Sequence, residues 1–280
     1  MRLALNHSLA PHLSIPEFLD FAAAAGVDAV ELRNGMPPGW HLPPAADVTT
    51  YAPARIARLA ADAGISVLTI NALLDFNRWN AERAEQARAL IATAAAAGID
   101  AIVLCPTVAA PGEAVPHSNL PSALDALIPL LTDAGIRGLV EPLGFPQASV
   151  RRAHDVDVCL RERGSPLCLG VVHDTFHHAL AGAAGYSPFI GLIHVSGVTR
   201  SDVPVAALGD EDRVLVTEVD TLASCAQIAA IGAGGGFAGN APAVSLEPFA
   251  RSVAESPTLA ADVRASLAVL ASLTTGTEPA

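Results

Sequence analysis

The sequence predicts an α/β protein that folds as a single (β/α)8 TIM barrel. Short apolar runs alternate with longer helical patterns along the whole chain, and eight such runs can be counted. Most of the runs are hydrophobic throughout, which is typical of parallel strands covered on both faces. The length of 280 residues also suits one barrel, since this fold commonly uses about 250 residues. We therefore expect one domain over residues 1–280, with a frayed, flexible tail from about residue 274.

The expected strands are runs of four to six residues, most of which end on a polar or charged side chain. In chain order they are Arg2–Asn6, Asp28–Arg33, Ser66–Asn71, Ala101–Cys105, Gly138–Glu141, Cys168–His173, Ile190–Val195 and Ala243–Glu247. Right-handed crossovers between successive runs then close the eight units into a barrel.

The segments between the strands are amphipathic or rich in Ala, and we expect them to be helices. They include Ile15–Ala25, Pro53–Ala63, Asn80–Ala97, Pro121–Ala134 and Val150–Arg163. Four stretches share one pattern, in which a Gly ends a helix and a β-branched residue opens the next strand: AAGVDAVEL, DAGISVLTI, AAGIDAIVL and DAGIRGLVE. This recurrence indicates repeated βα units within one barrel.

One long segment, Cys225–Val244, is nearly uncharged and resembles a membrane span in composition. Its glycines, Gly232 and Gly234–Gly236, would break a membrane helix. We therefore expect a buried helix, a Gly-rich turn and a strand.

Charge and composition exclude several classes of protein. The formal net charge is −12, and no Lys occurs anywhere, so Schiff-base aldolases and pyridoxal-phosphate enzymes, which need an amine nucleophile, are excluded. An acidic chain without a basic run also argues against nucleic acid and anionic membranes as partners.

The four cysteines lie in apolar segments without CxxC spacing, which is typical of reduced, buried thiols. The first residues lack the apolar core of a signal peptide, so we expect a cytoplasmic protein. The sequence leaves the oligomeric state open, and a homo-oligomer is compatible with it.

Function in this fold is expected at the C-terminal ends of the strands. The later strands end on Glu141, on His173 and Asp174, on His194 and on Glu247. Neighbouring strands lie about 4.8 Å apart, so these side chains can meet around one ion. Three carboxylates and one imidazole suit Mn²⁺, Mg²⁺ or Co²⁺ and tolerate Zn²⁺. Each residue alone also has a structural interpretation, as a helix cap or a core histidine.

At these positions the chain resembles the xylose-isomerase-like barrels, which include sugar epimerases, inosose isomerase, inosose dehydratase and the endonuclease IV group. Within that set it is most similar to the bacterial inosose (2-keto-myo-inositol) isomerases. The resemblance spans nearly the whole chain and is carried by LNALLDFN at 70–77, VEPLGFPQ at 140–147, HDTFHH at 173–178, DEDRV at 210–214 and VSLEPF at 244–249.

The resemblance implies that Glu141, Asp174, His194 and Glu247 hold one divalent metal ion, in agreement with the strand ends. It also implies that His177 faces the substrate oxygens, and the spacing of three residues from Asp174 puts both on one side of a turn that opens a helix.

Two further sites follow from the resemblance, and each shows a departure. Gln147 stands where related epimerases have a substrate-contacting Glu. Arg213 corresponds to the residue that steadies the metal-bound oxygens, with Arg200 as the other candidate; the structural alternative for either is a surface ion pair with a nearby Asp. Relatives usually follow that Arg with a Pro-Gly-x-Gly turn, which is missing here.

The earlier strands supply candidates for the opposite wall of a substrate pocket, with hydrogen bonds to hydroxyl groups: Asn6, Glu31, Arg33, Asn71 and Cys105. Alternatively, Glu31 and Arg33 form a structural pair. Phe76 and Trp79 are candidates for an apolar lip that excludes water, or for simple packing.

We therefore expect a metal-dependent isomerase that moves a carbonyl between adjacent carbons of a cyclic polyol ketone, with Glu141 and Glu247 exchanging the proton. The alternatives are another isomerase or epimerase of a sugar or hydroxy ketone, an inosose dehydratase, or a non-enzymatic sugar-binding barrel. A DNA-repair endonuclease is disfavoured by the acidic charge.

Overall fold

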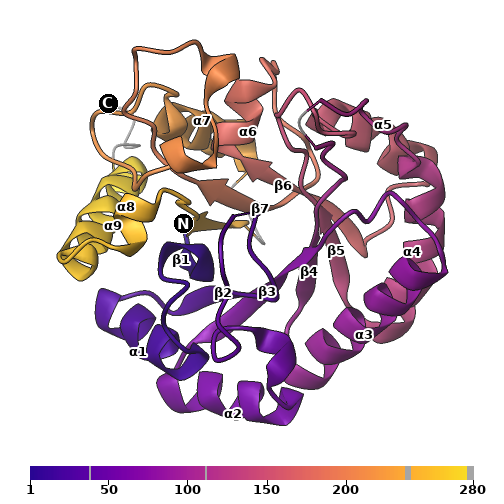
Figure 1. Ribbon diagram of the computed structural model, residues 1–280, viewed down its shortest axis with the longest axis horizontal. Helices are drawn as coiled ribbons and strands as arrows, with labels where there is room; N and C mark the ends of the chain where they lie inside the picture. Colours follow the sequence, from indigo (N-terminus) through magenta and orange to yellow (C-terminus); the bar gives the residue numbers. More distant parts are fainter. Residues whose placement is uncertain (38, 111, 237–240, 276–280) are drawn as a thin grey trace.

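The computed structural model describes residues 1–37, 39–110, 112–236 and 241–275. Eight parallel strands form a closed barrel in which each strand pairs with the next and β8 pairs with β1 (Figure 1). The strands are β1 Leu3–Asn6, β2 Ala29–Arg33, β3 Ser66–Leu73, β4 Ala101–Leu104, β5 Arg137–Val140, β6 Leu169–Asp174, β7 Ile190–Val195 and β8 Ala243–Leu246. The predicted (β/α)8 barrel is confirmed, with strand ends that shift by one or two residues.

Helices surround the barrel on its outside (Figure 1). They are α1 Ile15–Ala25, α2 Pro53–Ala63, α3 Ala81–Ala97, α4 Leu120–Ala134, α5 Ala153–Glu162, α6 Thr175–Leu180, α7 Ser224–Ile231, α8 Arg251–Ala254 and α9 Leu259–Thr275. Short 3-10 turns lie at His7–Leu9, Val48–Thr50, Val205–Ala207 and Asp210–Asp212.

The repeated Gly pattern has a simple conformational cause. The helices α1, α2, α3 and α4 each end on a glycine in the left-handed region, with φ between 67° and 85°: Gly26, Gly64, Gly98 and Gly135. A side chain is strained at such an angle, so Gly is the residue that lets the chain leave the helix and enter the next strand.

The hydrophobic residues on the two faces of the barrel sheet belong to two layers. A small cluster contains alternate strand residues, such as Val103, Leu139 and Val172. The intervening residues, such as Ile102 and Val171, join a much larger cluster with the buried faces of the helices. Because successive strand residues point to opposite faces, the small cluster fills the barrel and the large one lies between sheet and helices.

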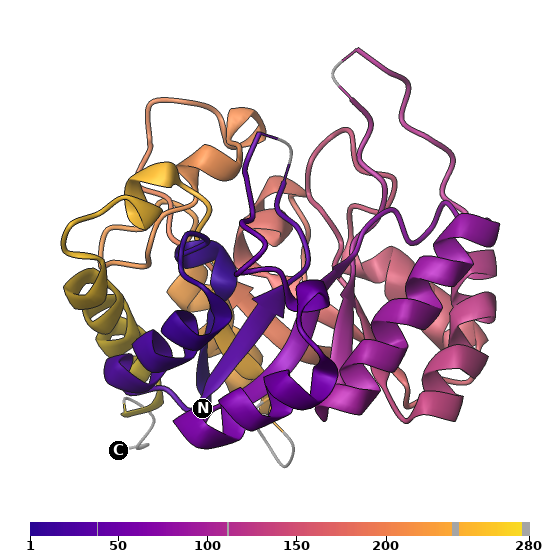
Figure 2. The same cartoon turned by 60° about the horizontal axis from the view of Figure 1, so that its bottom comes forward.

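The loops that follow the strands differ greatly in length. The longest follow β2, β4 and β7, over residues 34–52, 105–119 and 196–223. Figure 2 shows these loops rising above one end of the barrel, while the N-terminus lies at the other end. The open face therefore lies at the C-terminal strand ends.

Three other expectations can be compared with the structure. The uncharged segment forms α7, a kinked glycine stretch at Gly232–Gly236 and β8, while residues 237–240 lie outside the described part. Among the described residues, no helix has both the length and the apolar character that crossing a membrane requires. Of the tail expected from about residue 274, α9 includes Thr274 and Thr275, and residues 276–280 lie outside the described part. All four cysteines are free.

Candidate metal centre

Four side chains from consecutive strand ends converge at the open end of the barrel. Glu141, Asp174, His194 and Glu247 are all buried, and each offers one ligand atom within 4.8 Å of the others. Glu141 follows β5, Asp174 ends β6, His194 lies in β7 and Glu247 follows β8. The parallel register places these strand ends at one level, since Asp174 pairs with His194, and His194 with Ser245.

The His194 ring is held by carboxylates on both sides. Its Nδ1 atom lies 2.7 Å from Oε1 of Glu141 and 3.1 Å from Oε2 of Glu247. Its Nε2 atom lies 3.1 Å from Oε2 of Glu31. Burial alone would lower the pKa of His194, but the charges of these three glutamates outweigh it and raise the pKa well above its ordinary value. The ring therefore sits where a positive charge is strongly favoured.

Glu247 is the most heavily contacted of the four residues. Its Oε1 atom accepts hydrogen bonds from Arg33 Nη1 at 3.1 Å, Asn6 Nδ2 at 3.1 Å and Asn71 Nδ2 at 3.4 Å. Its Oε2 atom accepts one from Arg213 Nη2 at 2.8 Å. Burial alone would raise the pKa of Glu247, but His194, Arg213 and Arg33 lower it to about 2. This carboxylate is therefore fixed in its ionised form.

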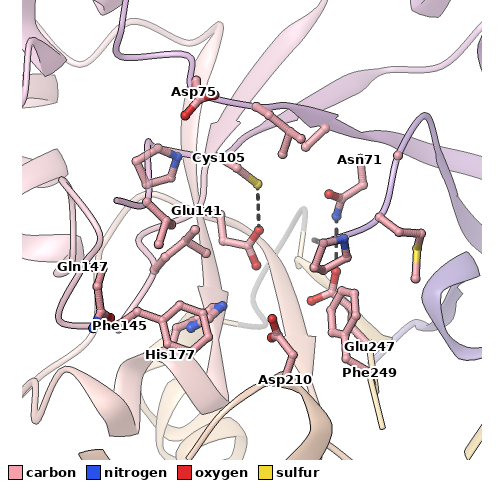
Figure 3. A pocket seen from close by; sticks show the side chains of 18 of the residues that line it. Asn71, Asp75, Cys105, Glu141, Phe145, Gln147, His177, Asp210, Glu247 and Phe249 are labelled. Carbon is pink, nitrogen blue, oxygen red and sulfur yellow. Dashed lines mark hydrogen bonds between the residues drawn. The ribbon is translucent and has the colours of Figure 1, made fainter. Parts of the chain in front are cut away.

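Glu141 has a different environment. Its Oε1 atom contacts His194, and its Oε2 atom accepts a hydrogen bond from the thiol of Cys105 at 3.4 Å (Figure 3). Burial and the charge of Glu141 raise the pKa of Cys105 well above its usual value, so the thiol is a neutral donor. No guanidinium group pairs with Glu141 among the described ion pairs.

Asp174 joins the metal site to the next helix. Its Oδ1 atom accepts a hydrogen bond from the backbone N–H of His177 at 2.9 Å and so caps α6. Its Oδ2 atom lies 2.6 Å from Arg213 Nη2. The His177 ring packs edge-on against Phe145 at 5.0 Å between centroids, and its buried Nδ1 atom has no hydrogen-bond partner among the described residues.

The charges of the cluster fit a divalent cation. The buried carboxylates outnumber the buried guanidinium groups by four to two: Glu31, Glu141, Asp174 and Glu247 against Arg33 and Arg213. With His194 neutral, as a metal ligand must be, two negative charges are thus unbalanced when all these groups are ionised. Burying uncompensated charge is strongly unfavourable, and one divalent ion would neutralise it. Carboxylate oxygens and one imidazole are also the ligand types that Mn²⁺, Mg²⁺, Co²⁺ and Zn²⁺ accept.

Glu141 and Glu247 of the cluster line a cavity of about 720 Å³, whereas Asp174 and His194 are buried and are not among its lining residues. Glu141, Glu247, Arg33 and Arg213 line its deep part together with Asn71 and Cys105, and Figure 3 shows His177 and Phe145 beside each other on one wall. The opposite wall carries Phe249, whose ring lies 4.6 Å from the guanidinium carbon of Arg213 and 5.2 Å from that of Arg33.

The structure brings most of the predicted site residues to this cavity. Asn71, Gln147, His177 and Arg213 line it, with Gln147 exposed at the rim. Asn6 is buried beneath it and contacts Glu247. The guanidinium group of Arg213, only 2% exposed, bridges Asp174 and Glu247.

Three of the candidate residues lie away from the cavity: Arg200, Phe76 and Trp79. The side chain of Arg200 is 48% exposed and forms ion pairs with Asp202 and Asp212, as the surface alternative expected. Phe76 is fully buried in the large hydrophobic cluster between sheet and helices and does not line the cavity. Its apolar ring is accommodated by packing against that core, and Trp79 packs there as well.

Sequence reasoning missed several partners in the site. Glu31 contacts His194 and not Arg33, whose ion pair is formed with Glu247. Asp210 lines the cavity and lies 3.4 Å from Arg213. The signal for Glu31 was its place at a strand end, but the choice of partner depends on how the strands close, which the sequence pattern does not give.

Comparison with known proteins gives the same architecture. The chain matches the family model described as xylose isomerase-like TIM barrel over residues 19–270. No curated protein sequence matches it. The crystal structure of a xylose isomerase domain containing protein from Salmonella typhimurium LT2 shares 32% sequence identity with it, at a TM-score of 0.82 over 98% of this chain and 97% of that chain.

Two more distant structures share the fold. The IOLI protein with a binding zinc atom is 19% identical, with a TM-score of 0.78 and full coverage of both chains. D-psicose 3-epimerase with D-tagatose, from Clostridium cellulolyticum H10, is 12% identical, with a TM-score of 0.73 over 98% of this chain and 99% of that chain. Because the family model covers most of the sequence, and the 32% identical relative nearly all of it, the chain belongs to the xylose isomerase-like TIM barrel family.

Proposed function

We propose that the protein is a divalent-metal-dependent isomerase that moves a carbonyl between adjacent carbons of a cyclic polyol ketone, with inosose as the first candidate substrate. The observation that carries this proposal is the buried cluster of three carboxylates and one imidazole, two of whose glutamates line an open cavity. The relatives support it, because one binds zinc and another is a sugar epimerase.

Glu141, Asp174, His194 and Glu247 would hold the metal ion. When bound, the cation would polarise the substrate carbonyl and stabilise negative charge on its oxygen. Arg213 bridges two of the four ligands and so keeps them in place.

The two glutamates have different surroundings, and this difference suggests separate roles. Moving the carbonyl requires removal of a proton from the neighbouring carbon and delivery of a proton to the former carbonyl carbon. Glu141 is the better base, because the outer oxygen of its carboxylate receives only a thiol hydrogen bond. Glu247, with contacts from Arg33, Asn6, Asn71 and Arg213, is held on the other side and stays ionised. The proton that Glu141 has taken up is therefore the one delivered to the former carbonyl carbon, and Glu141 returns to its ionised form.

A hydroxyl proton must also pass between the two substrate oxygens during the reaction. His177 suits this part, because its Nδ1 atom is unpartnered among the described residues and its ring lines the cavity. Asn71 and Gln147 are further candidates to bind hydroxyl groups, from the deep part and the rim.

The alternatives differ in what they need besides the metal site. An epimerase would use the same pair of glutamates on a sugar, and the amide of Gln147 at the rim is the feature that disfavours a simple epimerase. A dehydratase would need an acid placed to protonate a leaving hydroxyl group. A sugar-binding barrel would need no proton transfer at all.

The test is to incubate the metal-loaded protein with 2-keto-myo-inositol in D₂O and to follow the carbonyl and the C–H signals by NMR. The proposal expects a new keto isomer of the same mass, with deuterium at the carbon that gained a proton. Loss of one water would identify a dehydratase. Absence of any exchange in a metal-loaded sample, over a panel of keto-polyols and sugars, would contradict the proposal.

A further inference from the structure

The cavity is larger than a cyclic keto-polyol requires. Such a molecule has about twelve heavy atoms, and even if each took the share of a water molecule in the liquid, about 30 Å³, the ring would fill about 360 Å³. This is about half of the 720 Å³ above the metal centre. Cavities of several hundred Å³ are typical of larger, drug-sized ligands.

The outer part of the cavity is apolar. We call the outer wall six of the apolar side chains that line the cavity: Met36, Pro37, Leu74, Val108, Ala109 and Leu143. They come from the loops after β2, β3, β4 and β5. Leu74 and Val108 are 49% and 42% exposed, which places two large apolar side chains in water at the mouth of the site. Apolar surface gathered at a cavity mouth usually marks a binding surface.

The cations of the cavity are already paired. Arg33 is bound to Glu247, and Arg213 to Asp174, Glu247 and Asp210. No other Lys or Arg lines the cavity within the described chain. A phosphate or carboxylate on the substrate would therefore find no unpaired partner there, and Asp75 and Asp210 would repel it.

We propose that the substrate is a neutral keto-polyol ring that carries an apolar substituent, such as an alkyl or aryl group joined through an ether or glycosidic oxygen. The ring lies over the metal centre and the substituent lies against the outer wall. The position of the ring in this inference rests on the proposed function. The position of the substituent is inferred from the outer wall alone.

The inference is tested with pairs of compounds that differ in the substituent only. For turnover, 2-keto-myo-inositol is compared with its mono-O-benzyl ether and its monophosphate. For binding, myo-inositol is compared with mono-O-benzyl-myo-inositol by calorimetry on the metal-loaded protein. Burial of part of the benzyl group is expected to raise kcat/KM and affinity about tenfold. The phosphate is expected to bind more weakly than the parent compound.

Variants test whether the higher affinity and kcat/KM of the benzyl compounds depend on the outer wall. Leu74→Asn and Val108→Asn are expected to remove most of the benzyl advantage, because both side chains belong to the outer wall. Both are substantially exposed, so folding is expected to survive, and circular dichroism checks this. Leu167→Asn is the matched control, since Leu167 is 93% exposed in the loop between α5 and β6, away from the cavity, and the benzyl advantage should persist.

The outcomes separate the two proposals. If the parent ketone is turned over and the benzyl ether shows no higher kcat/KM or affinity, the inference of an apolar substituent is wrong. The proposed function is not affected by that result. Tighter binding of benzyl-inositol that is lost in Leu74→Asn, without turnover of any ketone, would support the outer wall and contradict the proposed function. An unchanged ligand preference combined with a shift in oligomeric state in Leu74→Asn would assign these residues to a subunit interface, and would also overturn the inference.

Discussion

The Oε2 atom of Glu31 lies 3.1 Å from Nε2 of His194, and both side chains are fully buried. Glu31 also accepts a hydrogen bond from the hydroxyl of Thr69 at 2.6 Å and one from the amide of Asn6 at 3.2 Å. The contact holds the ring so that Nδ1 points to Glu141 and Glu247. A carboxylate behind a metal-binding imidazole fixes the orientation of the ring and raises its basicity.

Replacing Glu31 by Gln is expected to weaken metal binding about 10- to 100-fold, because the charge that supports His194 is lost while the shape is kept. Competition with a chelator of known affinity measures the effect. Glu85→Gln, on the exposed face of α3, is the control and should bind metal as the wild type does. Equal affinities in the Glu31 variant and the wild type would mean that Glu31 does not support the ligand.

Replacing Arg213 by Gln is expected to lower the free energy of unfolding by about 3–5 kcal/mol, because Asp174 and Glu247 would each lose a buried ionic partner. Denaturant unfolding measures the change. Arg200→Gln is a matched control at an exposed ion pair, and its unfolding midpoint should hardly move, because such pairs contribute little. Similar midpoints for both variants would show that the Arg213 bridge does not stabilise the site.

Much of the architecture follows from local sequence. The helices over Ile15–Ala25 and Pro53–Ala63 have the predicted bounds, because a cap or proline begins each one and a left-handed glycine ends it. The ligand residues could also be anticipated, since a polar side chain at the end of a buried strand has few places to point except the open face of a barrel.

The choices that the sequence left open concern contacts between distant segments. Phe76 lies three residues after the end of β3 and packs in the hydrophobic core. An aromatic residue in a loop can line a pocket or join the core, and the apolar pattern does not distinguish the two. Arg200 and Arg213 lie on the same loop with acidic neighbours, yet one is exposed and the other is buried. The partner of each depends on how a long loop folds back, and local propensity does not specify that.

Replacing Glu141 by Gln is expected to slow solvent-deuterium exchange into the substrate by a factor of about 10² to 10⁴, because the amide can still face the metal but cannot accept a proton. NMR in D₂O measures exchange, and elemental analysis confirms that the variant still holds the ion. Glu113→Gln changes an exposed glutamate on the loop after β4 and should exchange normally. Undiminished exchange in the Glu141 variant would exclude it as the base.

Acid is expected to destabilise the protein well before the carboxylates titrate. Burial lowers the pKa of His7 from 6.5 to about 4, although its hydrogen bond to the carbonyl oxygen of Leu13 opposes this. Between these values the unfolded chain binds a proton that the folded chain does not. The stability that the neutral ring of His7 contributes is therefore complete above pH 6.5 and is lost towards pH 4, by about 3 kcal/mol.

Urea unfolding at pH 7, 6 and 5 measures this dependence, and His7→Gln should reduce its slope by about one proton. Part of the slope remains, because burial also lowers the pKa of His173 to about 4. His154→Gln, at an exposed histidine of α5, should keep the wild-type slope. A slope in His7→Gln that equals that of the wild type would mean that His7 is protonated in the folded protein.

Removing the metal is expected to lower the melting temperature, because an ion that binds only the folded cluster stabilises it by mass action. At a free metal concentration of about 100 times Kd the gain is about 2.7 kcal/mol, which corresponds to roughly 5 °C for a chain of this size. Melting curves with Mn²⁺ or Zn²⁺ and with a chelator measure the difference, and elemental analysis should find about one ion per chain.

The variant Asp174→Asn should lose most of the difference in melting temperature, because it removes a ligand charge, whereas Asp62→Asn on α2 should keep it. Identical curves with and without metal, together with no ion after reconstitution, would show that the two unbalanced charges of the cluster are compensated by protons.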